Sequence, residues 1–357
     1  MKYALITDTH FGVRNDSQIL LEYQKKFYGE IFFPYLDKND IKHIVHLGDL
    51  VDRRKSINFY TLNNLKDCFL SPALERNISI DLIVGNHDMY YKNTNQINAL
   101  NELCGDLERV DVYNNPTTTL LGTSGIEVCY VPWVCTENEK ETFDELENTS
   151  AQLVFGHLEI GGFTMQKGYV APTGKGLSKS TFDKFDMVFS GHFHYKSDDG
   201  HIYYLGNPYE TMWSDYNVPK GFHTFDPDSR ELEFIQNPYK LFHSIIYDDY
   251  KPVIDYQKSD LGYIKNCYVK VVVSNKTKQS EFDLFIDRIY TQSPADVTII
   301  EDLSEFNIDE EIDEAEDTMT ILGKYVDGLN LDVDKDILNS KINSLYVEAL
   351  NLNDNFS

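Results

Sequence analysis

One pattern constrains this chain more than any other: a short apolar run followed by Asp, Asn or His recurs along the sequence. Each run has the length and composition of a buried β-strand, and helical stretches lie between several of them, as in a layered α/β domain. The expected strands are Tyr3–Ile6, Ile44–Leu47, Leu82–Val84, Leu153–Phe155 and Met187–Phe189. The polar residues that follow them are Asp8 and His10, Asp49, Asn86 and His87, His157, and finally His192 and His194.

These polar residues have the chemistry of metal ligands. The ends of the strands in an open α/β sheet meet at one crevice, so side chains from separate runs are expected to converge there. Carboxylate and imidazole groups together suit divalent ions of borderline hardness such as Mn²⁺, Fe²⁺ or Zn²⁺. A carboxylate that bridges two ions lets both act on one phosphate, and Asp49 is the natural candidate for that bridge. The sequence therefore predicts a metal centre.

Composition narrows the class of protein. The chain of 357 residues has 41% hydrophobic and 25% charged residues, which is ordinary globular usage. Its formal net charge of −26 argues against a free-standing DNA-binding protein, although residues 301–357, with 16 acidic and 3 basic side chains, account for −13 of it. The five cysteines form no Cys-x-x-Cys pair, and no run of about 18 apolar residues occurs. We therefore expect a reducing, cytoplasmic setting and no membrane segment.

Four segments are expected along the chain. After Asn237-Pro238 the pattern changes to a strand, a helix and a strand, which predicts a small separate α/β unit. Residues 301–317 carry ten acidic side chains and no basic one, as a solvated linker does. Beyond the linker, the sequence predicts a helix with apolar residues on one face, namely Leu338, Ile342, Leu345, Ala349 and Leu352. This helix would dock either on its own domain or in the groove of a partner. The predicted segments are a main domain over 1–240, the small unit over 241–303, the acidic linker over 304–330 and the C-terminal helix over 331–357.

Two groups of motifs resemble those of one known family. Asp8-Thr9-His10-Phe11-Gly12 and Gly85-Asn86-His87-Asp88 resemble motifs of the calcineurin-like metallophosphoesterase superfamily, in particular of its DNA-repair nuclease branch, typified by SbcD. Recombination nucleases of T-even phages are similar in a longer stretch, which runs from Ser190-Gly191-His192-Phe193-His194 through Tyr204-Leu205-Gly206-Asn207-Pro208-Tyr209 to Trp213 and Lys220-Gly221-Phe222. The resemblance spans residues 1–240 and, more loosely, the rest. It implies an α/β fold in which two β-sheets form a sandwich flanked by helices, with a small α/β capping domain and a C-terminal helix.

The resemblance also implies a set of ligands for two divalent metal ions. Mn²⁺ is the ion expected first, with Mg²⁺, Fe²⁺ or Zn²⁺ as alternatives for the same ligands. One ion would be held by Asp8, His10, Asp49 and His194, and the other by Asp49, Asn86, His157 and His192. His87 would not be a ligand. It would donate a proton to the leaving 3′ oxygen or stabilise charge in the transition state, and the alternative is a histidine that only caps a turn.

The sequence departs from the pattern of many relatives just after Asp49. Those relatives place a histidine there, whereas Asp52 and Arg53 stand here, so a second catalytic histidine is not expected. Asp52 is a candidate for orienting a ligand imidazole through its other ring nitrogen. The densest basic run of the chain lies here and consists of Arg53, Arg54 and Lys55. These side chains would either bind a DNA phosphate or be three solvated charges without a role.

Together these features predict a two-metal phosphodiesterase that acts as a DNA exonuclease or endonuclease in recombination and repair, in the cytoplasm of a bacterium or of a phage-infected host. The resemblance implies three partners: DNA, an SbcC-like ATPase of the ABC/SMC coiled-coil type, and a second copy of the chain, as a homodimer within a heterotetramer. A phosphoesterase for a small or protein phosphate substrate would have the same metal site, and a scaffold with a vestigial site is a third alternative. The choice between exonuclease and endonuclease, and the polarity, stay open.

Overall fold

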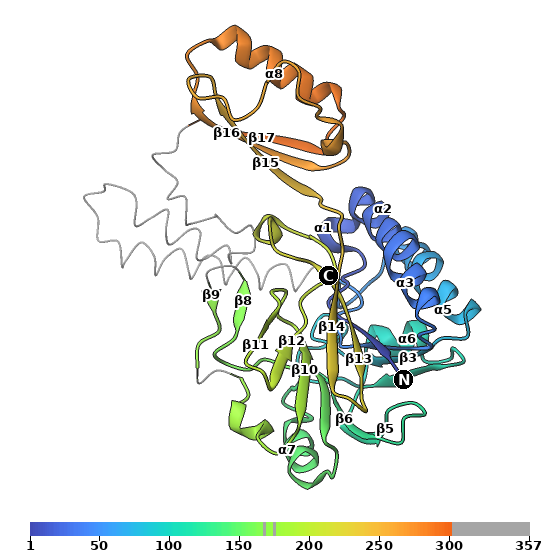
Figure 1. Cartoon of the computed structure of the whole chain (residues 1–357). Coiled ribbons are helices and arrows are strands. Elements are labelled where there is room, and N and C mark those ends of the chain that lie inside the picture. Colours follow the sequence, from blue (N-terminus) through green and yellow to red (C-terminus); the bar gives the residue numbers. More distant parts are fainter. Residues whose placement is uncertain (167–168, 174–175, 302–357) are drawn as a thin grey trace, which may run out of the picture. The chain divides into compact units, whose positions relative to one another are not determined.

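The computed structural model describes residues 1–166, 169–173 and 176–301, and all structural statements below refer to them. Residues Met1–Glu301 form one compact unit. Two mixed β-sheets, each of six strands in the described part, make up most of it (Figure 1). None of the described helices has the length and apolar character needed to cross a membrane.

The first sheet carries a parallel core with an antiparallel edge. In spatial order the strands are β14 (Glu231–Gln236), β13 (Gly221–Asp226), β1 (Tyr3–Ile6), β2 (His43–His46), β3 (Ser79–Ile83) and β4 (Val110–Tyr113). Four of the strands, β1 to β4, run parallel to one another. The other two, β13 and β14, come later in the sequence and add to one edge in antiparallel orientation.

The second sheet also has a parallel centre, and each of its edges is antiparallel. Its strands, in spatial order, are β11 (Ser197–Asp198), β12 (Ile202–Tyr204), β10 (Met187–Gly191), β7 (Leu153–His157), β6 (Glu127–Val131) and β5 (Thr117–Leu120). A short hairpin of β8 (Thr164–Gln166) and β9 (Tyr169–Val170) stands apart from it.

The helices cover the outer faces of both sheets (Figure 1). On the first sheet lie α1 (Val13–Asp16), α2 (Gln18–Phe27), α3 (Phe33–Lys38), α4 (Phe59–Leu65), α5 (Ser71–Glu75) and α6 (Ala99–Cys104), and on the second lies α7 (Glu139–Asn148). Single π-helical turns over Tyr28–Phe32 and Lys66–Leu70 join α2 to α3 and α4 to α5. The Ser17 hydroxyl begins α2 by accepting a hydrogen bond from the Leu20 N–H.

Three apolar layers hold this arrangement together. Because side chains alternate along a strand, Ala4 and Ile6 of β1 pack against the helices, whereas Tyr3 and Leu5 pack between the sheets. The face of the second sheet that carries Val154 packs against α7 and neighbouring loops. The predicted sandwich of two sheets flanked by helices is therefore confirmed.

Residues 242–301 form a smaller α/β element with its own apolar core. Its three parallel strands are β15 (Phe242–Asp248), β16 (Tyr268–Asn275) and β17 (Asp296–Ile300), and α8 (Gln279–Thr291) crosses one face of them. The strand, helix and strand expected from the sequence are present, and β15 is an additional strand that the sequence did not predict. The boundary at 240/241 stays a prediction, and the acidic linker and C-terminal helix lie outside the described residues.

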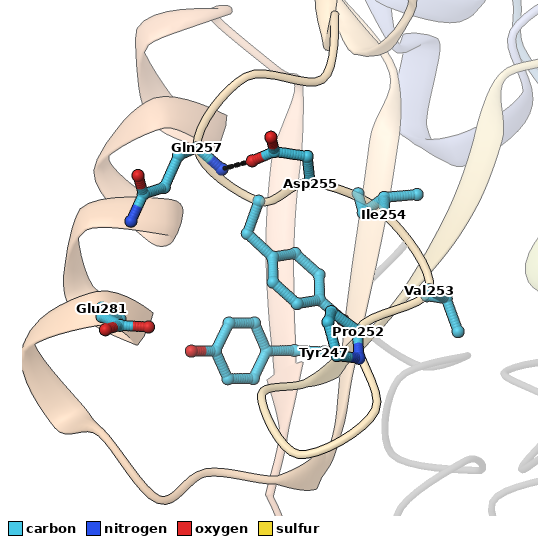
Figure 2. A pocket seen from close by; sticks show the side chains of 8 residues that line it. Tyr247, Pro252, Val253, Ile254, Asp255, Gln257 and Glu281 are labelled. Carbon is cyan, nitrogen blue, oxygen red and sulfur yellow. Dashed lines mark hydrogen bonds between the residues drawn. The ribbon is translucent and has the colours of Figure 1, made fainter.

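A pocket of about 530 Å³ opens on this smaller element (Figure 2). It lies between the start of α8, which contributes Glu281, and the loop that follows β15, which contributes Pro252 to Gln257. The Asp255 carboxylate turns back to accept a hydrogen bond from the Gln257 N–H, 3.0 Å away. None of the predicted ligands lines this pocket.

A buried carboxylate fixes the point where the chain enters the smaller element. Glu210, only 2% exposed, accepts hydrogen bonds from the Leu241 and Phe242 N–H groups at 2.6 and 2.9 Å. Nearby, the Trp213 ring packs on the Phe242 ring with centroids 5.0 Å apart.

We predict that Glu210→Ala lowers the free energy of unfolding by about 2–4 kcal/mol, because two buried N–H groups lose their acceptor. Urea unfolding of the whole chain measures this. The matched control is Glu231→Ala, which removes an exposed carboxylate and should change the free energy by less than about 0.5 kcal/mol. Equal losses in the two variants would contradict the role given to Glu210.

Candidate metal centre

Every predicted ligand stands at the carboxyl end of a strand. Asp8 and His10 follow β1, Asp49 follows β2, and Asn86 and His87 follow β3 in the first sheet. His157 is the last residue of β7, and His192 and His194 follow β10 in the second sheet. These ends of the two sheets meet, so that the side chains of all these residues lie together.

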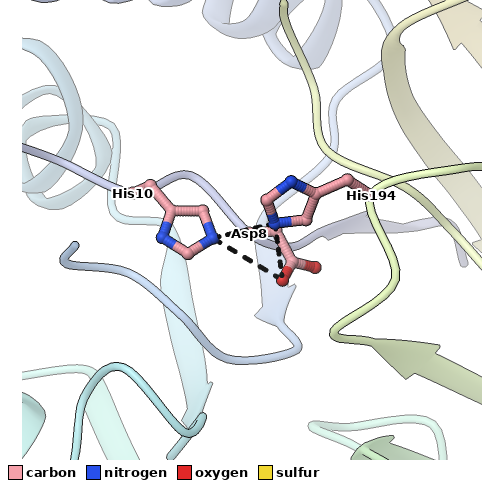
Figure 3. Close-up of side chains that lie close together, drawn as sticks. All are labelled: Asp8, His10 and His194. Atoms are coloured by element: carbon pink, nitrogen blue, oxygen red, sulfur yellow. Dashed lines mark hydrogen bonds and ion pairs between the residues drawn. The ribbon is translucent and has the colours of Figure 1, made fainter. Parts of the chain in front are cut away.

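The first cluster joins Asp8, His10 and His194 (Figure 3). The Nε2 atoms of the two imidazoles point at each other across 3.0 Å. The Asp8 Oδ1 lies 3.9 Å from the His10 Nε2 and 3.8 Å from the His194 Nε2. One ligand atom from each residue thus faces a common point, as a metal-binding set does.

The second cluster joins Asp49, Asn86, His157 and His192. The Asn86 Oδ1 lies 3.0 Å from the His157 Nε2 and 2.9 Å from the His192 Nδ1. The Asp49 Oδ2 lies 3.4 Å from the same His157 nitrogen. His192 therefore faces the cluster with Nδ1, whereas His157 faces it with Nε2.

Asp49 is a member of the second cluster and also lies beside His10 of the first, with which it and His87 form a further candidate set. Its Oδ2 is 3.7 Å from the His10 Nε2 of the first cluster and 3.4 Å from the His157 Nε2 of the second. Its other oxygen, Oδ1, accepts a hydrogen bond of 2.8 Å from the His87 N–H. The carboxylate is 2% exposed and lies where the sequence places a bridge.

The pKa shifts suit a set of metal ligands. Burial lowers the pKa of His10 well below its usual value and that of His192 to about 3, so both imidazoles are neutral and offer a lone pair. Burial works against the charge of Asp49, but the neighbouring His157 holds the pKa of Asp49 well below its usual value. Burial likewise opposes the charge of His157, and contact with Asp49 nevertheless raises its pKa to about 9. A cation bound here would take the place of that proton, so these residues fit a divalent metal ion.

Backbone groups set the orientation of two histidines. The Nδ1 of His157 lies 2.7 Å from the Leu47 carbonyl oxygen, and the Nδ1 of His87 lies 2.7 Å from the Asp52 carbonyl oxygen. A carbonyl only accepts, so each Nδ1 carries the hydrogen and each Nε2 is left for the site. The Asp52 carboxylate lies 3.6 Å from the His10 Nδ1, too far for a hydrogen bond but on the side where it would orient that ring.

The turns at the strand ends bring backbone very close to the ligands. A Cβ on Gly85 would lie 2.2 Å from the Asp49 Oδ1, and one on Gly48 would lie 2.4 Å from the His157 Nδ1. Gly48 also has a φ of +100°, which side chains rarely adopt. Neither glycine can be replaced without displacing a predicted ligand.

Sequence reasoning missed two residues of the site. Asp88, fully buried, accepts hydrogen bonds from the N–H groups of Asp49, Gly85 and Val51 at 2.8, 2.9 and 3.2 Å. It ties the loop after β2 to the loop after β3, and burial followed by the charge of Asp49 raises its pKa to about 7. Trp133 packs on the His192 ring with centroids 4.7 Å apart. Asp88 stood at the end of a recognised motif, but no local signal marked Trp133.

The three side chains of the basic run beside the site differ in whether they are already paired. Arg53 is paired with Asp16, at 3.1 Å, and donates to the Asn15 side chain, at 3.2 Å. Arg54 and Lys55 make no hydrogen bond or ion pair in the described part of the chain, and the Lys55 Nζ lies 5.9 Å from the Tyr90 ring centroid. Of the three candidates, Arg54 and Lys55 are therefore the ones with charge to offer.

A helix-flanked sandwich that gathers carboxylates and imidazoles at its strand ends has the architecture of a metal-dependent phosphoesterase. The family model described as calcineurin-like phosphoesterase matches residues 1–196. Exonuclease subunit 1 of Enterobacteria phage T4 is 31% identical over 352 residues, which cover 98% of this chain and 99% of that protein. The SbcD component of the nuclease SbcCD of Staphylococcus epidermidis is 24% identical over 353 residues, 91% of this chain and 92% of that protein.

The chain belongs to the calcineurin-like phosphoesterase family. The predicted family, its fold and the prediction of a metal-dependent phosphodiesterase are thereby confirmed. The family uses divalent metals, and the clusters described above are candidates for holding them.

We predict that Gly85→Ala weakens Mn²⁺ binding at least about 10-fold, because the new methyl group would overlap the Asp49 carboxylate and its N–H. Isothermal titration calorimetry with Mn²⁺ measures the affinity. Gly29→Ala is the matched control, because a Cβ at that exposed helical position meets nothing within 4 Å. Unchanged binding by the Gly85 variant would show that the position of Asp49 does not matter for the metal.

Proposed function

We propose that this chain is a two-metal DNA nuclease that works with an SbcC-like ATPase of the ABC/SMC type. The observation that carries the proposal is the sharing of Asp49 between two clusters of ligand atoms, one containing His10 and the other His157. Asp8, His10, Asp49 and His194 would hold one ion, and Asp49, Asn86, His157 and His192 the other. The similarity to two nuclease subunits over nearly the whole chain supports DNA as the substrate.

The bound ions would supply Lewis-acid activation of a water molecule and of the scissile phosphate. The donor set suits Mn²⁺ first, because carboxylate, amide and imidazole groups are combined without any thiolate. The side chains that would hold the ions come from both sheets, so the sandwich sets their spacing. Asp88 would keep the Asp49 loop and the Asn86 loop in register through its three backbone contacts.

His87 would act on the leaving group. Its Nδ1–H is committed to the Asp52 carbonyl, so the ring can give or take a proton only at Nε2. The ring packs edge-on to His10 with centroids 4.9 Å apart, beside the first cluster, and is only half-buried. With a proton on Nε2, this partly open imidazole would donate it to the departing 3′ oxygen, which leaves the ring neutral with its hydrogen on Nδ1.

The partnership with an ATPase is proposed from the relatives. Both are named as subunits of a nuclease, and one of them belongs to SbcCD. A partner of this kind would supply basic surface that a chain with a net charge of −26 lacks. We also propose that two copies of the chain pair within that assembly.

We predict that His87→Ser lowers turnover of linear duplex DNA with Mn²⁺ by about 10²–10⁴-fold, the usual contribution of a general acid. Mn²⁺ affinity should be unchanged, because His87 is not among the proposed ligands. Turnover is measured with and without the ATPase and ATP, and affinity by calorimetry. Asp49→Asn is the companion variant, and it should lose both DNA turnover and Mn²⁺ affinity.

Three outcomes decide between the candidate functions. Cutting by the His87 variant at the wild-type rate would remove the role given to His87. Hydrolysis of bis-nitrophenyl phosphate without any cutting of DNA, even with the ATPase, would favour a phosphoesterase for small substrates. Failure of the wild-type chain to bind Mn²⁺ would favour a scaffold with a vestigial site.

We predict that Arg54→Ala and Lys55→Ala each weaken DNA binding and lower the slope of log affinity against log salt by about 1, as the loss of one phosphate contact does. Arg53→Ala should have a smaller effect, because Asp16 already neutralises that guanidinium. Fluorescence anisotropy over a salt series measures the slopes. If all three variants have the same slope as the wild type, the three side chains do not contact DNA phosphate and are solvated charges without a role.

A further inference from the structure

The stretch between Tyr204 and Phe222 provides no predicted metal ligand, yet it contains a buried lysine that contacts the backbone of His194. Lys220 is 4% exposed, and its ammonium group donates to three acceptors. They are the His194 carbonyl oxygen, at 3.0 Å, the Asn207 Oδ1 and the Asp215 carboxylate. A lysine ammonium has three hydrogens, so all of its donors are used.

The acceptors of Lys220 are themselves held in place. The Asp215 Oδ2 accepts from the Thr211 N–H at 2.8 Å and from the Met212 N–H at 3.2 Å. The Asn207 amide nitrogen donates to the Tyr209 carbonyl at 2.9 Å. The ammonium group therefore occupies one position relative to the backbone of this stretch.

The loop that carries His194 has little else to fix its backbone. In the described part of the chain, residues 193–196 form no backbone–backbone hydrogen bond. The Phe193 ring stacks on Tyr204 with centroids 4.3 Å apart, and Gly206 packs under the His194 carbonyl. The His194 side chain is 25% exposed, whereas those of Asp8 and His10 are almost fully buried.

We propose that Lys220 is a positioning residue for the first metal position: by holding the His194 carbonyl, it sets where the His194 Nε2 points relative to Asp8 and His10. This inference rests on the proposed metal-dependent function. Lys220 makes no hydrogen bond or ion pair with Asn86, His157 or His192 in the described residues, so its influence is specific to the first position.

The test is Mn²⁺ titration of the whole chain by calorimetry and electron paramagnetic resonance. The wild type should bind two ions. Lys220→Met should weaken one of them about 10- to 100-fold and leave the other unchanged. Lys196→Met is the matched control, because this exposed lysine lies in the same loop and makes no hydrogen bond or ion pair in the described structure, so both ions should bind it as they bind the wild type.

A second variant guards against misfolding. Lys220→Met leaves the Asp215 carboxylate buried without its cation, so the double variant Lys220→Met/Asp215→Asn is titrated as well, and circular dichroism shows that each variant is folded. Selective loss of one ion in a folded variant supports the proposal. Normal binding of both ions by the variant, or equal weakening of both, overturns the proposal for Lys220. The proposed function then still stands if the wild-type chain binds two ions. A wild type that binds no Mn²⁺ overturns the proposed function instead, and this inference with it.

Discussion

The site depends on one carboxylate and on what keeps it in place. Asp49 is the side chain that reaches both clusters, and each part of it is occupied: Oδ2 faces His10 and His157, Oδ1 accepts the His87 N–H, and its own N–H donates to Asp88. Its backbone lies in the left-handed region, with a φ of 56°, and the turn at Gly85 leaves no space beside it. A buried acidic group is costly unless cations or hydrogen-bond donors contact it, and here the His157 imidazole and the His87 N–H do so. The two clusters are therefore not independent, because a shift of Asp49 changes both.

Other predicted ligands also have a strained backbone. Asp8, His10 and His192 also have positive φ values, of 51°, 41° and 83°. Such conformations cost on the order of 1–3 kcal/mol each and persist only where the surrounding structure determines them. The surroundings here are the ends of strands whose other residues are packed between the two sheets or under the helices. The His192 N–H, for example, donates to the Asp8 carboxylate at 3.0 Å, so the strained turns of the two sheets brace each other. The sandwich thus serves the site by supplying rigid strand ends.

Local sequence patterns predicted those features that depend on neighbours in the chain. The strand β1 was expected over Tyr3–Ile6 and is found there. Each predicted ligand stands at the end of an expected strand, so its place in the fold could be read from the sequence. Contacts between distant residues could not be read in this way. Asp88 acts on Asp49, and Lys220 acts on His194, through hydrogen bonds that no periodicity reports. The strand β15 was missed for another reason: His243 and Ser244 interrupt its apolar residues, so it lacks the continuous apolar run by which the other strands were recognised.

The stretch from Asn207 to Lys220 shows how residues without a ligand atom can matter to the site. On one side Lys220 holds the His194 loop, and on the other Glu210 and Trp213 contact the beginning of β15. Asp215 belongs to both sides, since it pairs with Lys220 and also binds the N–H groups of Thr211 and Met212, which separate Glu210 from Trp213. Buried polar networks in which every member is paired resist partial rearrangement, because breaking one contact leaves several groups unsatisfied. The entry to the smaller α/β element and the least buried histidine of the first cluster are therefore held by one short length of backbone.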